Sequence, residues 1–230
     1  MPENGLFALD ASPSLRSRIS DALREAIADG RLKPGQRLIE RELCEVFKVS
    51  RPSLREAMRE LEAEGYIETV PHRGPRVCIV DENALRNGSE ALAVLESLSA
   101  RLCAERADDK QRQVLRERLI DLDEAVASAE KTIILKTRDA FFDSMLDAAN
   151  NKVVAGMLRP LRHRLTQTRG AALDHPGRAV MLAREANEIL GAIERKDGEG
   201  AQRLCTASLT AGYIAALHVI RSTVCLQMSA

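Results

Sequence analysis

Several features are scarce or missing in this sequence, and each absence excludes a class of protein. Lysine plus arginine equals aspartate plus glutamate at 34 each, so the net charge of zero gives no basic signature of nucleic-acid binding. No apolar run approaches the roughly 20 residues that a membrane span needs. Residues 1–13 lack the basic start and the long apolar core of a signal peptide. We therefore expect a soluble, cytoplasmic protein with a loose tail over residues 1–12.

Disulfide motifs and paired metal-binding cysteines are also missing. The five cysteines are odd in number and form no C-x-x-C pair, and their neighbours are apolar or helical: Cys44, Cys78, Cys103, Cys205 and Cys225. This usage is typical of buried, reduced thiols in a cytosolic protein. A redox switch remains the alternative interpretation.

The strongest positive signal is one predicted helix that is capped at Ser50 and stops at Gly65. A serine at that place can accept hydrogen bonds from the free N–H groups of the first turn. Arg51 and Arg55 are four residues apart and share a face near the start. Arginine there can bond N7 and O6 of guanine in the major groove and also hold phosphates, so the segment predicts a DNA-reading helix. An apolar stripe at three- and four-residue spacing predicts its buried face: Leu54, Ala57, Met58 and Leu61.

The neighbouring segments predict the rest of a DNA-binding fold. Upstream, apolar residues at four-residue spacing predict a helix over 14–29, followed by a Pro-Gly turn and a short helix over 40–47. Downstream, residues 66–70 and 76–80 alternate like two strands around a turn. Three helices plus a hairpin with a basic tip make a winged helix-turn-helix, which we place at residues 13–80.

These residues resemble the GntR family of bacterial transcription regulators. The matching words are AIADGRLKPGQRL at 26–38, EL at 42–43, SR at 50–51, LREAM at 54–58, LEAEG at 61–65 and RG at 73–74. The family usually has Thr-Pro where this chain has Pro52-Ser53, a swap that keeps a small hydroxyl available to DNA. The resemblance implies DNA contacts at these positions: Arg41, Arg51, Ser53, Arg55, and His72, Arg73 and Gly74 at the wing. Glycine in the wing would let the backbone approach the minor groove.

Some of the basic residues also have a plainer interpretation. Arg41 could pair only with Glu45 along its own helix. Arg59, one turn beyond Arg55, is more readily a partner of neighbouring glutamates than a base reader. His72 in a turn is by itself an ordinary surface residue.

The remaining sequence predicts a second, all-helical domain. Residues 88–230 are rich in alanine, leucine, glutamate and arginine and contain no convincing strand, which suits a helical bundle behind a linker at 81–87. The expected helices cover 89–107, 110–130, 132–148, 151–171, 178–196 and 199–225. The predicted fold class is therefore mainly α, with a winged helix-turn-helix followed by an all-α bundle.

This second half resembles the FCD domain, the effector-binding and dimerisation partner of the winged head in the fatty-acid-regulator subfamily of GntR proteins. Supporting words are LE at 95–96, LCA at 102–104, DAFF at 139–142, NN at 150–151 and EANEILGAI at 185–193. The resemblance covers nearly all of the second half and implies a small-molecule effector.

Many FCD domains hold a divalent metal with one aspartate and three histidines, and this sequence keeps only the aspartate. The aspartate matches Asp139, while the histidine positions fall at Asp143, Asn187 and Ser208. The loss of the imidazoles removes the nitrogen ligands that hold zinc or nickel tightly. We therefore expect no metal cofactor. Weak binding of a hard cation such as Mg²⁺ or Ca²⁺ through oxygen ligands stays open.

Two ways of binding an organic effector also stay open. The four residues of the lost metal site could bond hydroxyl or amino groups of the effector directly. Alternatively, Arg162 and Arg169, seven residues apart on one expected helix face, could clamp a carboxylate, with His163 nearby and Arg164 pointing elsewhere. The plainer interpretation of each is a polar core network or a solvated surface without any ligand.

The sequence therefore predicts a regulator rather than an enzyme. No nucleophile stands at local spacing from a base, no glycine loop for phosphate is present, and the four histidines are scattered. We expect a homodimeric repressor on a palindromic operator, modulated by a carboxylate or other polar metabolite in the helical domain. Two alternatives stay open: a constitutive DNA-binding dimer without an effector, and an enzyme that carries a DNA-binding head.

Overall fold

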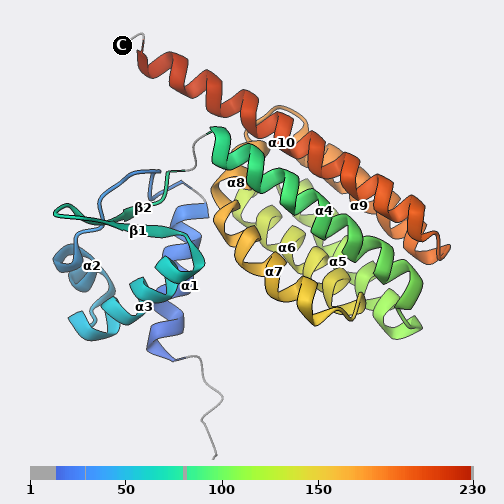
Figure 1. Ribbon diagram of the computed structural model, residues 1–230, viewed down its shortest axis with the longest axis horizontal. Coiled ribbons are helices and arrows are strands. Elements are labelled where there is room, and N and C mark those ends of the chain that lie inside the picture. Colours follow the sequence, from blue (N-terminus) through green and yellow to red (C-terminus); the bar gives the residue numbers. More distant parts are fainter. Residues whose placement is uncertain (1–13, 29, 80–81, 229–230) are drawn as a thin grey trace, which may run out of the picture.

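The computed structural model describes residues 14–28, 30–79 and 82–228, which form a winged head and a helical bundle (Figure 1). The head, residues 14–79, contains α1 (Leu15–Ala28), α2 (Glu40–Phe47), α3 (Arg51–Glu64), β1 (Ile67–Val70) and β2 (Gly74–Val77). The bundle, residues 82–228, contains α4 (Glu82–Arg106), α5 (Asp109–Ser128), α6 (Lys131–Ala148), α7 (Lys152–Arg164), α8 (Thr166–Leu173), α9 (Arg178–Glu194) and α10 (Gly198–Met228). The predicted fold class is confirmed. The predicted tail over 1–12 lies outside the described residues.

The head is built around the apolar stripe predicted for α3. Leu54, Ala57 and Leu61 are completely buried, and Met58 is nearly so. The stripe packs on α1 and on the hairpin. Helix α1 contributes Ile19, Leu23 and Ile27 to this core, and the hairpin contributes Ile67 and Val77. Because this stripe orients α3, the opposite face of the helix is left to solvent.

Both predicted ends of α3 are confirmed. Ser50 Oγ accepts a hydrogen bond from the backbone N–H of Ser53 at 3.4 Å and so caps the first turn. Gly65 follows the last turn with φ of 83°, in the left-handed region where a side chain is strained. The helix therefore starts and stops for local reasons that the sequence displays.

The wing is shorter than predicted. The second strand is not at 76–80, because β2 begins at Gly74 and ends at Val77, paired antiparallel with β1. His72 adopts a left-handed φ of 64°, and Arg73 N donates to the carbonyl of Val70 at 3.0 Å. A turn of three residues is therefore enough to reverse the chain.

In the bundle, α4 and α10 run side by side along its length (Figure 1). Helices α5, α6 and α9 enclose a core in which Phe141 and Phe142 of α6 are buried. Local caps mark two of the helix starts. Asp108 and Gln111 form a capping box at α5, and Asn151 caps α7.

The predicted linker at 81–87 is wrong, because α4 already begins at Glu82. The Glu82 carboxylate pairs with the guanidinium of Arg221 on α10, which ties the first turn of α4 to the bundle. A carboxylate at a helix start is favourable in itself. Val80 and Asp81 lie outside the described residues.

The predicted single helix at 151–171 is in fact two helices, α7 and α8. They are separated at Leu165, whose φ of −95° and ψ of 10° depart from the α-helical values. Pro160 lies inside α7 and removes one backbone hydrogen bond shortly before the break.

Helix α10 corrects the expectation that no segment has membrane-spanning length. Residues 198–222 are long and apolar enough to cross a membrane by length and composition, with a mean hydropathy of 1.3. In this fold the helix instead packs along α4, α8 and α9. Only 22% of the segment is buried, so much of its surface faces outward.

The cysteines are free thiols wherever the structure describes their side chains. Cys103 and Cys205 are buried, and Cys44 and Cys78 are partly buried. Burial raises the pKa of the Cys103 thiol to about 12, which makes it a poor nucleophile. The prediction of buried thiols is confirmed for Cys103 and Cys205, whereas Cys44 and Cys78 are only partly buried. The side chain of Cys225 lies outside the described part.

The head rests against the bundle through α1 and α3, which contact α8 and α7 respectively. The hydroxyl of Tyr66, a buried residue between α3 and β1, lies 3.4 Å from Thr166 Oγ1 of α8, and burial raises the pKa of this tyrosine. Its ring lies against the imidazole of His163, with 5.5 Å between the centroids. A Cβ at Gly170 of α8 would lie 2.7 Å from the carbonyl oxygen of Ala28. We call these contacts the junction.

Candidate functional site

The first turn of α3 presents the predicted base-reading residues to solvent. Arg51 and Arg55 are exposed, and 60% of the Arg55 side chain is accessible. Ser53 is partly exposed beside them, whereas Leu54 is completely buried. The packing of α3 therefore leaves two guanidiniums and one hydroxyl outside, as a major-groove reader requires.

Arg55 is oriented by a contact between α3 and α2. Its Nε lies 2.9 Å from Oε1 and 3.0 Å from Oε2 of Glu40, and this hydrogen bond raises the pKa of Arg55. The arginine is mostly exposed, so the pair adds little to stability. The ion pair instead affects geometry, because Glu40 holds the guanidinium of Arg55 in one direction relative to α3. Arg41, the next residue on α2, is exposed as well.

The wing carries the remaining predicted DNA contacts. His72 and Arg73 are exposed in the turn, and Gly74 begins β2 with φ of 80°. A Cβ at Gly74 would meet nothing within 4 Å, so within this chain the glycine is needed for its backbone conformation rather than for space. Contact of these residues with DNA stays a prediction.

In the bundle, two positions of the lost metal site, Asp139 and Asp143, form ion pairs with arginine. Asp139 of α6 lies 2.5 Å from Arg169 of α8 and 2.9 Å from Arg138. Desolvation would raise the pKa of Asp139, but the charges of Arg169 and Arg138 outweigh it and hold that pKa below its usual range. Asp139 is thus a carboxylate shared by two guanidiniums.

Arg162 lies in the core rather than on an open helix face. Its side chain is only 4% exposed, and its Nη2 lies 3.0 Å from Oε1 of Glu96, which is completely buried. Its Nη1 lies 2.6 Å from Asp143. Burial would lower the pKa of Arg162, but the charges of Glu96, Asp143 and Asp139 together outweigh burial and raise it. Arg162 therefore serves two carboxylates of the protein itself.

The prediction that Arg162 and Arg169 share one helix face is wrong, because α7 ends between them. They are linked in another way: Arg169 Nη2 donates to the carbonyl of Arg162 at 3.0 Å and to Thr166 Oγ1 at 3.2 Å. The hydroxyl of Thr166 also meets Tyr66 of the head. Arg169 therefore touches the junction.

The prediction that Asn187 and Ser208 join the two aspartates is wrong. Asn187 is exposed, and its Nδ2 donates to the carbonyl of Ala183 one turn earlier in α9. Ser208 is buried, and its Oγ donates to Glu185 at 2.6 Å. Asn187 is exposed because the buried face of α9 is formed by Leu182, Ala186, Ile189 and Leu190, and position 187 lies outside that face.

These residues do not fit a divalent metal. Within residues 14–28, 30–79 and 82–228, no group of three or more histidine, cysteine, aspartate or glutamate side chains could hold a metal ion. Asp139 and Asp143 are each bound to a guanidinium, whose charge repels a cation. Four buried or nearly buried arginines supply the positive charge of this region: Arg138, Arg162, Arg169 and Arg178.

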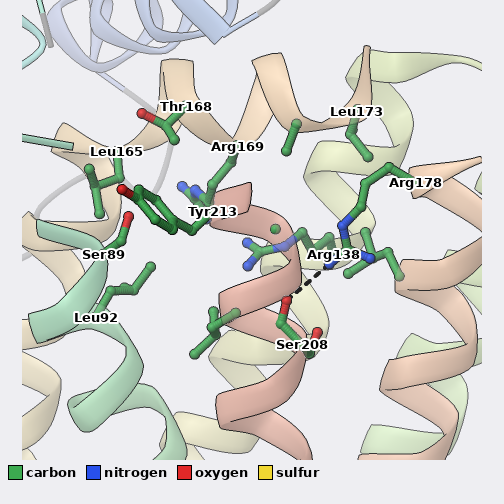
Figure 2. Close-up of a pocket in the computed structure, with 14 residues that line it drawn as sticks. Ser89, Leu92, Arg138, Leu165, Thr168, Arg169, Leu173, Arg178, Ser208 and Tyr213 are labelled. Carbon is green, nitrogen blue, oxygen red and sulfur yellow. Dashed lines mark hydrogen bonds between the residues drawn. The ribbon is translucent and has the colours of Figure 1, made fainter. Parts of the chain in front are cut away.

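A cavity opens beside these pairs, between α4, α6, α8, α9 and α10 (Figure 2). Its volume is about 60 Å³. Its polar lining includes three guanidiniums and several hydroxyl groups: Arg138, Arg169, Arg178, Thr168, Ser208 and Tyr213. Of the predicted effector residues, Arg169 and Ser208 line the cavity, while Asp139 holds Arg169 without lining it.

Arg138 and Arg178 are candidate site residues that the sequence interpretation missed. Each occupies a place in an apolar stripe. Arg138 lies one turn after Ile134 and one turn before Phe142, and Arg178 lies one turn before Leu182. An arginine in such a stripe is rarely buried without a partner, so the pattern was a usable signal. The pattern did not show that Arg138 and Arg178 line one cavity, because α6 and α9 are distant in the sequence and reach that cavity only through folding.

The head and the bundle each match a known protein family. Residues 15–77 match the model of the bacterial regulatory proteins of the gntR family, and residues 89–211 match the FCD domain. Both matches agree with the resemblances and the domain order predicted from the sequence.

Relatives along most of the chain are named as transcription regulators. The chain is 26% identical over 201 residues to the HTH-type transcriptional repressor RspR of Escherichia coli strain K12, covering 87% of this chain and 88% of that protein. It is 25% identical over 198 residues to the uncharacterized HTH-type transcriptional regulator YdhC of Bacillus subtilis strain 168, covering 86% and 88%. Escherichia coli McbR/YncC has the same fold, with a TM-score of 0.77 at 24% identity over 89% of this chain and 97% of that one. These names favour a regulator over an enzyme.

Proposed function

Because the chain belongs to the GntR family of bacterial regulatory proteins, we propose that this DNA-binding transcription regulator is a repressor that acts as a homodimer on a palindromic operator. A small effector in the FCD domain controls its affinity for DNA. The observation that carries the proposal is the first turn of α3, where Arg51, Ser53 and Arg55 face solvent beside a buried stripe. The protein acts in the cytoplasm, where bacterial operator DNA lies.

Dimerisation is supported by the weak charge of the head. Residues 14–80 hold 13 lysines and arginines against 11 aspartates and glutamates, a net charge of only +2. Non-specific affinity for DNA comes mainly from neutralised phosphates, so one head binds weakly and two joined heads compensate. Helix α10 offers a face for the second copy, because its apolar segment is only 22% buried and Ile214 is 60% exposed.

Selection of random duplexes with the full-length protein tests this function. The recovered sequences are expected to share a palindrome, and sedimentation should find two chains on each duplex. Affinity for the selected duplex should fall steeply with added salt. Scrambling one half-site is the control and should remove most of the specific affinity. Recovery of no common sequence, or one chain on each duplex, would contradict the proposal.

Control by an effector requires that the bundle influence the head, and the junction supports this. Arg169 lines the cavity and donates to Thr166, whose hydroxyl meets Tyr66 of the head. A ligand that moves Arg169 therefore acts one side chain away from the head. It shifts DNA affinity only to the extent that it prefers one placement of the head over another.

Gly170→Ala is expected to loosen the head without unfolding the bundle. Alanine favours a helix over glycine by roughly 0.5–1 kcal/mol, but its Cβ would lie 2.7 Å from Ala28 O, so α1 must move away. Amide hydrogen exchange in α1 should speed up about tenfold, while α4 and α6 keep their protection. Gly156→Ala in α7 is the matched control, since a Cβ there meets nothing within 4 Å. Equal protection of α1 in the two variants would show that the junction does not hold the head.

A further inference from the structure

Three guanidiniums line the cavity of the bundle, and no carboxylate of the described residues lines it with them. Two of them, Arg138 and Arg169, share the single carboxylate of Asp139. The third, Arg178, lies 2.9 Å from Glu185, which also accepts a hydrogen bond from a serine. The cavity wall therefore holds more guanidinium groups than the carboxylates that face them.

Arg138 has no carboxylate to itself, because Asp139 is shared with Arg169. Its side chain is only 8% exposed, and burial together with the charge of Arg169 lowers its pKa. The next carboxylates, Glu96 and Asp143, are both bound by Arg162. The region as a whole is neutral, because Arg162 holds two carboxylates. At the cavity wall itself, however, three guanidiniums are bound to only two carboxylates, so an anion in the cavity would lie against guanidinium groups.

Buried polar atoms around the cavity also lack partners among the described residues. Nη1 of Arg178, Nε of Arg169 and Oγ1 of Thr168 are inaccessible to solvent and have no hydrogen-bond partner there. The side chains of Arg178 and Arg169 are only 8% and 10% exposed. Buried donors are nearly always satisfied in folded proteins, so these atoms indicate a ligand. Figure 2 shows the three arginines directed around the same space.

Much of the rest of the wall is hydrocarbon, beside several hydroxyl groups, and this restricts the class of ligand. Leucine side chains from several helices line it: Leu92, Leu165, Leu173, Leu182 and Leu209. A planar guanidinium binds a carboxylate through two parallel N–H bonds, and leucines bury an apolar body. The cavity volume of about 60 Å³ restricts the ligand to a small, compact molecule.

We propose that this cavity binds a small organic monocarboxylate directly on Arg138, Arg169 and Arg178, with no metal ion between ligand and protein. The arginines take the place of the cation that other FCD domains use, and the leucines cover the hydrocarbon part. The proposal names the class of effector and rests on the proposed function for its regulatory role. Binding itself is measured without DNA.

Thermal shift and calorimetric titration of the full-length protein, each with and without EDTA, test the site. The probes are benzoate and hexanoate, their neutral counterparts benzamide and hexanamide, and inorganic phosphate. The two carboxylates are expected to raise the melting temperature saturably, because they bind only the folded protein. The amides and phosphate should have at least about tenfold weaker effects, since one lacks the charge and the other the apolar body.

Three variants locate the binding. Arg178→Lys keeps the charge but loses the planar fork, and should weaken benzoate binding at least about tenfold. Gly212→Leu should abolish binding by filling the cavity from α10. A Cβ there lies 3.5 Å from Arg178 Nη2, an ordinary contact, and leucine favours a helix over glycine, so the fold is retained. Arg184→Gln on the exposed face of α9 is the control and should leave binding unchanged.

Four results would overturn the site: equal binding of acid and amide, stronger binding of phosphate, stabilisation that EDTA removes, or no stabilisation by either carboxylate. Full benzoate binding by Gly212→Leu would place the ligand elsewhere and overturn it as well. Carboxylate binding that leaves DNA affinity unchanged would support the site and contradict its role as the effector site. Failure of the duplex selection would remove the proposed function while the benzoate titration still decides the cavity.

Discussion

Alanine at both Arg51 and Arg55 is expected to abolish operator-specific binding and leave the protein folded. Both side chains are exposed in the first two turns of α3, so their truncation creates no cavity. A bidentate contact with guanine contributes roughly 1–3 kcal/mol, and the pair together should therefore lower affinity at least about 30-fold. The two arginines lie one turn apart and share a groove, so their combined effect need not equal the sum of the single effects.

Fluorescence anisotropy with the selected duplex and a scrambled duplex measures this loss. Arg59→Ala, one turn further along α3, is the matched control and should bind within about threefold of the unmodified protein. The double variant should approach the affinity of the scrambled duplex, because base contacts rather than phosphate contacts are lost. Unchanged preference for the selected duplex would show that other residues read the operator.

Arg162→Met is expected to destabilise the bundle by about 3–5 kcal/mol, because it leaves a buried charge without its partner. Glu96 is completely buried, and its Oε1 depends on Arg162 Nη2 at 3.0 Å. Its Oε2 has no hydrogen-bond partner among the described residues, so no second group compensates. A loss of this size is a large fraction of the 5–15 kcal/mol that typically holds a domain together. Urea denaturation followed by circular dichroism measures it.

A second ion pair on the same helix supplies the control. Arg159 of α7 lies 2.9 Å from Asp147, but their side chains are 54% and 67% exposed. Arg159→Ala should therefore change stability by no more than about 1 kcal/mol. Adding Glu96→Gln to Arg162→Met removes the orphaned charge and should recover part of the lost stability. Similar losses for Arg159→Ala and Arg162→Met would show that burial of the pair is not what matters.

The sequence by itself determined the winged head and the helical character of the bundle. The stripe at Leu54, Ala57, Met58 and Leu61, the cap at Ser50 and the stop at Gly65 are all confirmed. They were predictable because apolar periodicity and capping act between residues a few positions apart. Exposure of Arg51 and Arg55 follows from the same periodicity, since a buried stripe on one face leaves the other outside.

Helix ends that depend on packing could not be predicted as well from the sequence. The first turn of α4 has no strong start signal of its own, and Arg221 of α10 holds it at Glu82. In the same way, nothing near Leu165 marks the break between α7 and α8 except Pro160 five residues earlier. Such ends depend on contacts between segments that lie far apart in the chain.

Only the tertiary structure decided what the arginines of the bundle do. Arg162 pairs with Glu96 across 66 positions and Arg169 with Asp139 across 30, while Arg138 and Arg178 reach one cavity from α6 and α9. Asn187 was assigned to the site because it falls at the position of a family histidine, yet it sits beside the buried stripe of α9 and faces solvent. A residue pattern records which face of a helix is apolar. Which charges meet across that face depends on how separate helices cross, and that is set by the packing of the whole bundle.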